Sequence, residues 1–157
     1  MAVDSTGFRR KMDLLRKFND DNVINYLNAA AFFVVNKLVD EVLAGQEGFD
    51  YPKDYPSSVK EGETGFIGIV TNRLRDSMGY ESPTQFQRII KQTSPSLAPY
   101  FRDATDHVKN RYGIGIMEIT IQLYGEEVLQ EAQRMLSKAI QDIKNGNLQP
   151  YKSGFAN

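Results

Sequence analysis

The chain has 157 residues, of which 41% are hydrophobic and 25% are charged, and its formal net charge is −1 at pH 7. The absence of Cys and the presence of a single His exclude thiol catalysis and leave few side chains for a transition metal. The balanced charge excludes nucleic-acid binding through an overall basic field, although a local patch can still bind phosphates. We expect a single domain spanning residues 1–157, cytoplasmic and without a secretory signal or membrane span.

The first 20 residues are predicted to form an N-terminal helix or arm. Apolar residues recur near one helical face, at Phe8, Met12, Leu15 and Phe18. A break is predicted at residues 19–21, which are Asn and Asp. The densest basic cluster of the chain lies in this arm, at Arg9, Arg10, Lys11, Arg16 and Lys17. The cluster can contact DNA phosphates or an acidic partner, or it is a solvated helix face.

The strongest helical pattern covers residues 22–44, and Gly45 is expected to end that helix. Phe32 and Phe33 fall outside its main apolar stripe, so the helix is apolar over more than one face. Such a helix is central to a core or is shared with a partner. We therefore expect Phe32 and Phe33 to take part in an interaction between subunits.

Residues 46–65 are predicted to form a long loop, either a partner-contacting excursion or a simple connector. The segment 66–78 that follows fits a strand or a helix equally well. Ser-Pro pairs at 82–83 and 94–95 predict helices over residues 84–91 and 96–110, and Gly113 is expected to end the second helix.

The last third of the chain is predicted to contain a strand and a helix. Alternating apolar residues over 116–124 predict the strand, with Met117, Ile119, Ile121 and Leu123 on one face. Its hydrogen-bonding partner would be residues 66–70 or a strand of another subunit. A turn at Gly125 is expected to lead into a helix over residues 126–144, which Asn145-Gly146 ends. Its buried stripe is expected at Val128, Ala132, Met135, Leu136, Ala139, Ile140 and Ile143. The polar tail, residues 146–157, is expected to be mobile or docked on a partner.

These elements together predict an α+β fold: a mostly helical single domain with a long central helix, a small sheet and a C-terminal helix.

No motif in the chain indicates an enzyme. His107 follows Asp103 by one helical turn, which fits half of a metal site or a carboxylate–His pair, but a surface helix residue explains it better. Ser57 and Lys60 have the spacing of a Ser-x-x-Lys nucleophile but lack its companion motifs, and the two glycines at 113 and 115 lack the third of a dinucleotide fingerprint. We expect no catalytic residue, no cofactor and no metal site.

One short segment, Thr71-Asn72-Arg73-Leu74-Arg75-Asp76-Ser77-Met78, resembles the Thr-Gly-x-Leu-Arg-x-Ser-Ile signature of tailed-phage virion morphogenesis proteins. Asn72 replaces the glycine of that signature and Met78 replaces its isoleucine. The resemblance extends over roughly residues 29–80, where a long apolar helix and a Pro-containing loop precede the signature.

The family resemblance implies a structural protein of the virion, a neck, head–tail connector or tail-completion subunit that forms an oligomeric ring. It implies other neck or tail proteins as partners, and a location in the virion after assembly in the host cytoplasm. Arg73 and Arg75, which bracket Leu74, are expected to bind a carboxylate or phosphate on a neighbour.

Overall fold

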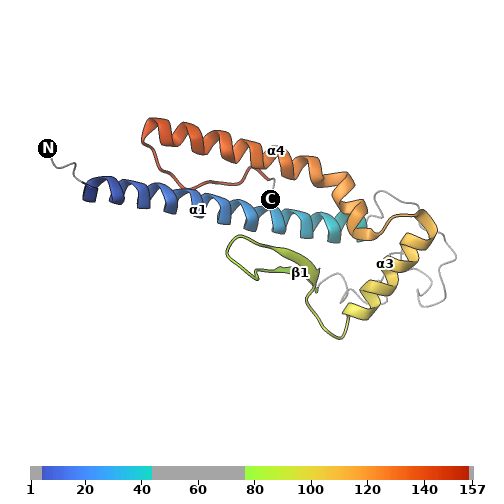
Figure 1. Cartoon of the computed structure of the whole chain (residues 1–157). Helices are drawn as coiled ribbons and strands as arrows, with labels where there is room; N and C mark the ends of the chain where they lie inside the picture. Colours follow the sequence, from blue (N-terminus) through green and yellow to red (C-terminus); the bar gives the residue numbers. More distant parts are fainter. Residues whose placement is uncertain (1–4, 44–76, 156–157) are drawn as a thin grey trace.

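The computed structural model describes residues 5–43 and 77–155, except for the side chains at positions 5, 100, 103, 104, 107, 111 and 112. The elements in chain order are α1 (Ser5–Lys37), the π-helix η1 (Leu38–Leu43), β1 (Met78–Glu81), β2 (Ile89–Gln92), α3 (Ala98–Tyr112) and α4 (Ile116–Asn145). This confirms the predicted α+β class, mostly helical with one small sheet. In Figure 1, α4 lies antiparallel along α1, the hairpin of β1 and β2 lies on the other side of α1, and α3 lies at one end.

Helix α1 is continuous through residues 19–21, so the predicted break there is wrong. Asn and Asp each cost only about 0.6 kcal/mol relative to Ala in a helix interior, which tertiary packing readily offsets. Asn22 shows that packing, because its buried side chain accepts a hydrogen bond from the backbone N–H of Tyr151 at 2.9 Å. The predicted arm and central helix are therefore one rod, which η1 extends with the buried residues Leu38, Val42 and Leu43. The predicted end of this helix at Gly45 lies outside the described residues.

The predicted strand at residues 116–124 is wrong, because these residues form the first turns of α4. The buried residues at this end of α4 are Ile116, Ile119, Thr120 and Tyr124, whose spacing is helical. Gly115, with an extended backbone, is the N-cap, and its carbonyl accepts the Ile119 N–H at 2.9 Å. Gly125 is likewise inside α4 and does not form a turn. The apolar residues of this nine-residue segment fit both the two-residue period of a strand and the 3.6-residue period of a helix, and the segment is helical in the structure.

The predicted helix over residues 84–91 is also wrong, since Ile89–Gln92 is strand β2, paired antiparallel with β1. The register places Met78 opposite Gln92 and Glu81 opposite Ile89. Arg88 holds the connecting turn to α1: its guanidinium donates to the carbonyls of three turn residues and, at 2.7 Å, to the side-chain oxygen of Asn28. Within the described residues the sheet is thus this hairpin, which does not include residues 116–124. Residues 66–70, proposed as their pairing partner, lie outside the described residues.

The two helix ends predicted from glycines are confirmed. Gly113, at φ 76°, ends α3 and donates its N–H to the Lys109 carbonyl at 2.8 Å. Gly146, at φ 68°, ends α4 in the same left-handed conformation, which glycine adopts without steric cost. Helix α3 covers most of the predicted range 96–110, with Leu97 as N-cap.

The main apolar core lies at one end of the two-helix rod, where η1, β1, α3 and the first turns of α4 meet. Its buried members are Phe33, Leu38, Val42, Leu43, Met78, Val108, Ile116, Ile119 and Tyr124. Toward the other end, α1 and α4 pack mainly on each other and on the tail (Figure 1). Across the described helices, none is both long enough and apolar enough to span a membrane.

Candidate functional site

The C-terminal tail, residues 147–155, runs back between α1 and α4 on its own chain (Figure 1). Tyr151 is buried there, and its ring lies edge-on to that of Tyr26 with centroids 6.5 Å apart. Tyr26 in turn donates its hydroxyl to the Val128 carbonyl at 2.9 Å. The expectation that the tail is mobile or docked on a partner is therefore wrong for these residues.

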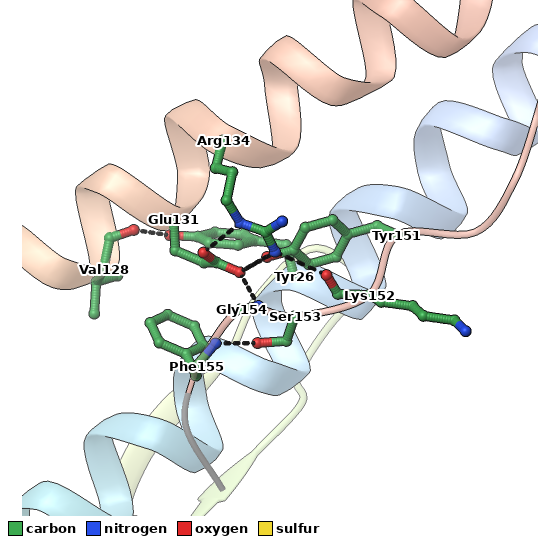
Figure 2. Close-up of polar contacts among 9 residues, drawn as sticks. All are labelled: Tyr26, Val128, Glu131, Arg134, Tyr151, Lys152, Ser153, Gly154 and Phe155. Atoms are coloured by element: carbon green, nitrogen blue, oxygen red, sulfur yellow. Dashed lines mark hydrogen bonds and ion pairs between the residues drawn. The ribbon is translucent and has the colours of Figure 1, made fainter.

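Glu131 of α4 holds the tail, as Figure 2 shows. Its buried carboxylate accepts two hydrogen bonds from the Arg134 guanidinium, at 2.7 and 2.8 Å. It also accepts the hydroxyl of Tyr151 and the backbone N–H of Gly154. Arg134 adds a bond to the Lys152 carbonyl at 2.8 Å. We call this group of Glu131, Arg134, Tyr151 and Gly154 the tail clasp.

The clasp keeps the Glu131 carboxylate ionised over a wider pH range than usual. The Arg134 hydrogen bonds, aided by Tyr151 and Gly154 and opposed by burial, lower the pKa of Glu131 to about 2. Burial and the hydrogen bond to Glu131 raise the pKa of Tyr151 to about 12. A carboxylate with so low a pKa is a poor general base near neutral pH, so this cluster is suited to fastening the tail and not to proton transfer.

Phe33 and Phe32 have opposite environments, although both are predicted as interaction residues. Phe33 is 7% exposed and stacks on Phe155 of the tail, with ring centroids 4.4 Å apart. The ring of Tyr124 meets it edge-on. Phe33 is thus a core residue, and its predicted place on an interaction surface is wrong. Phe32 is 56% exposed and remains available for contact.

Helix α4 carries a stripe of exposed aliphatic side chains along one flank, next to its buried face. We call it the outer stripe; its members are Ile121, Leu129, Leu136, Ile140 and Ile143. At about 100° per residue they fall within about one third of the helix circumference. The last three were predicted to be buried, and that prediction is wrong, whereas Met135 and Ala139 of the same prediction are buried.

The first turns of α1 extend past the end of α4 (Figure 1). This basic arm, residues 6–17, carries exposed Arg9, Arg10, Lys11, Arg16 and Lys17 against a single acid, Asp13. Phe8 in the arm is 64% exposed and Met12 is exposed as well. Leu15, on the same helical face, is half-buried and borders a shallow hollow with Ile143 of α4. The face that α4 covers farther along α1 is thus exposed in the arm.

Several predicted residues fall outside the described part of the chain. Arg73 and Arg75 do, together with Ser57, Lys60, the loop 46–65 and most of the segment Thr71–Met78. Asp103 and His107 lie in α3, but their side chains are outside the described set.

The tail clasp was not predicted from the sequence. The two isolated aromatics of the polar tail, Tyr151 and Phe155, are its sequence signal. Their contacts could not be predicted, because the partners lie up to 129 positions away in the sequence. Among the described residues, no group of three or more His, Asp and Glu side chains is placed to hold a metal ion.

Comparison with protein-family models, curated proteins and solved structures found no match to this chain.

Proposed function

We propose that this protein is a non-enzymatic structural subunit that assembles with copies of itself and with other proteins into a virion neck or tail end. The observation that carries the assembly role is the outer stripe of α4. The stripe lies along a helix of 30 residues, about 45 Å long. Large aliphatic side chains concentrated on one rigid face are characteristic of protein–protein contact surfaces.

The shape of the subunit supports the same role. Because α1 and α4 form a thin layer, each helix has one face packed inside the subunit and another directed outward. Exposed Phe8, Met12, Leu14 and Phe32 add apolar surface on α1. The assignment to a phage neck, head–tail connector or tail-completion subunit rests on the resemblance of Thr71–Met78, and ring formation is part of that proposal.

Native mass determination of the full chain over a range of concentrations tests the assembly role. We expect an oligomer that electron microscopy resolves as a closed ring. The double substitution Leu129→Lys with Leu136→Lys should reduce the mass to that of a monomer without loss of helical circular dichroism. Phe86→Lys, at a similarly exposed aromatic in the turn between β1 and β2, is the control. A protein that stays monomeric at high concentration would contradict the proposal.

A second candidate is a small binding module for nucleic acid or for a host protein. The observation in its favour is the projecting basic arm, in which every basic side chain is exposed. Phosphate binding by this arm would give an affinity for duplex DNA that falls steeply with salt. The same native mass measurement with and without DNA distinguishes the two candidates.

A further inference from the structure

Resting on the proposed assembly role, we infer that the basic arm of one copy docks on the first half of the outer stripe of the next copy. The docking partner is thus a second copy of this chain, and the contact joins two different surfaces. The inference depends on charge, on shape and on the position of the two surfaces at opposite ends of the rod.

The charges of the two surfaces are complementary. The basic arm carries five basic side chains and one acid. In α4, residues 116–133 contain four Glu and no Lys or Arg. Glu118 and Glu126 of this stretch are exposed, and the helical period places Glu118 on the stripe and Glu126 beside it. Opposite charge on two apolar surfaces guides association and selects the partner.

The apolar parts also match in spacing. Phe8, Met12 and Leu15 share one face of the arm, at intervals of four and three residues. Arg9 and Arg16 lie on one flank of that face and Lys11 on the other, as the helical period dictates.

On α4, Ile121 and Leu129 stand two turns apart with Gly125 between them. A Cβ at Gly125 would meet only Ile121, at an ordinary 3.6 Å, so the fold itself has room for a side chain there. This gap between two large aliphatic residues is a hole into which a side chain of another helix, such as Phe8 or Met12, fits.

The two surfaces cannot meet within one molecule. Helix α1 is continuous over 33 residues, about 50 Å, and the arm begins it. Because α4 is antiparallel to α1, its acidic first half lies beside the opposite end of α1 (Figure 1). An arm that docks on this half must therefore belong to another copy. Such a head-to-tail contact builds a ring when its rotation closes and a filament when it does not.

A mixing experiment with the full-length chain tests this inference. The arm variant carries Phe8→Glu and Met12→Glu, and the stripe variant carries Ile121→Lys and Leu129→Lys. Each variant alone retains one intact half of the contact and should be monomeric. An equimolar mixture should give a 1:1 heterodimer and nothing larger, because only one functional contact can form per pair. Phe86→Glu is the control and should assemble as the unchanged protein does.

A third variant separates assembly from folding. Gly125→Leu fills the gap with a better helix former, so its thermal midpoint should not fall. Its self-association should nevertheless weaken at least about tenfold, as expected for a central contact position. Unchanged association of Gly125→Leu would contradict the inference.

The remaining outcomes separate this inference from the proposed function. If the unchanged protein assembles and the arm variant assembles equally well, the contact is wrong while the assembly role stands. If the mixture stays monomeric, the contact between arm and stripe is wrong. If the arm variant loses a salt-dependent affinity for duplex DNA and keeps its assembly, the arm binds nucleic acid instead. If the unchanged protein is monomeric at every concentration, the assembly role fails as well.

Discussion

The groove between α1 and α4 and the outer stripe of α4 lie on the same two helices, yet within the described residues only the groove is covered by the chain itself. In the groove, the tail supplies Tyr151 and Phe155 as apolar cover and satisfies the buried polar groups of Asn22 and Glu131. The outer stripe has aliphatic side chains of similar size but, among the described residues, no segment that covers them. Among the described residues, the chain thus covers one of these two apolar surfaces and leaves the other exposed.

The neighbouring residues Phe33 and Phe32 should show this difference most strongly. Phe33→Ala removes a buried ring that stacks on Phe155 and contacts Tyr124, so the free energy of unfolding should fall by about 3–5 kcal/mol. Phe32→Ala, at an exposed position, should change it by less than about 0.5 kcal/mol. Urea denaturation of both variants measures the two changes. Equal losses of unfolding free energy would show that Phe33 and Phe32 do not differ in burial.

Removal of the Glu131 carboxylate should cause the next largest loss of unfolding free energy. Glu131→Ala removes the acceptor of Arg134, Tyr151 and Gly154 at once and should destabilise the protein by about 2–3 kcal/mol. Hydrogen exchange of the Gly154 and Tyr151 amides should accelerate, since the tail is released. Glu126→Ala, at an exposed position of the same helix, is the control and should leave these amides protected.

Acid should release the tail without any substitution. The pKa of Glu131 is about 2 in the folded protein and near 4.5 in the unfolded chain. The clasp therefore makes its full contribution to the stability of the folded protein above pH 4.5. This contribution is lost as the pH falls from 4.5 toward 2. The shift corresponds to about 3 kcal/mol, which we reduce to about 1–2 kcal/mol because Arg134 is half-exposed and screened by solvent. A pH series of unfolding free energies should show this loss, and Glu131→Gln should lack it.

The sequence predicts the fold class and the elements whose signals are local. Glycines at 113 and 146 mark two helix ends because a left-handed residue is needed there, whatever surrounds it. Residues 116–124 and 84–91 are mispredicted because local pattern does not decide between strand and helix over so few residues. In the first case packing of Ile116, Ile119 and Tyr124 selects the helix, and in the second β1 supplies the pairing that makes Ile89–Gln92 a strand.

The candidate sites also divide into features that the local sequence predicts and features that depend on tertiary packing. The exposed charges of the basic arm are evident from the sequence, and so is the apolar character of α4. Which apolar residues of α4 are buried depends on where α1 and the tail lie. Tyr151 donates its hydroxyl to Glu131, 20 positions away, and its backbone N–H to Asn22, 129 positions away, so no short window along the chain contains the contacts that hold the tail.

The smallest expected effect on folding belongs to the outer stripe. Leu136→Ala and Met135→Ala remove side chains of similar volume from adjacent positions of α4. Met135 is buried and Leu136 is exposed, so Met135→Ala should cost about 2–5 kcal/mol and Leu136→Ala less than about 0.5 kcal/mol. The measurement is urea denaturation at a protein concentration low enough to keep the subunit monomeric, since an assembled stripe would be buried. At higher concentration Leu136→Ala should instead lower the fraction assembled if Leu136 contributes to a contact. Should Leu136→Ala destabilise the isolated subunit as much as Met135→Ala does, the outer stripe is covered within the subunit, and the distinction between a closed groove and an open stripe does not hold.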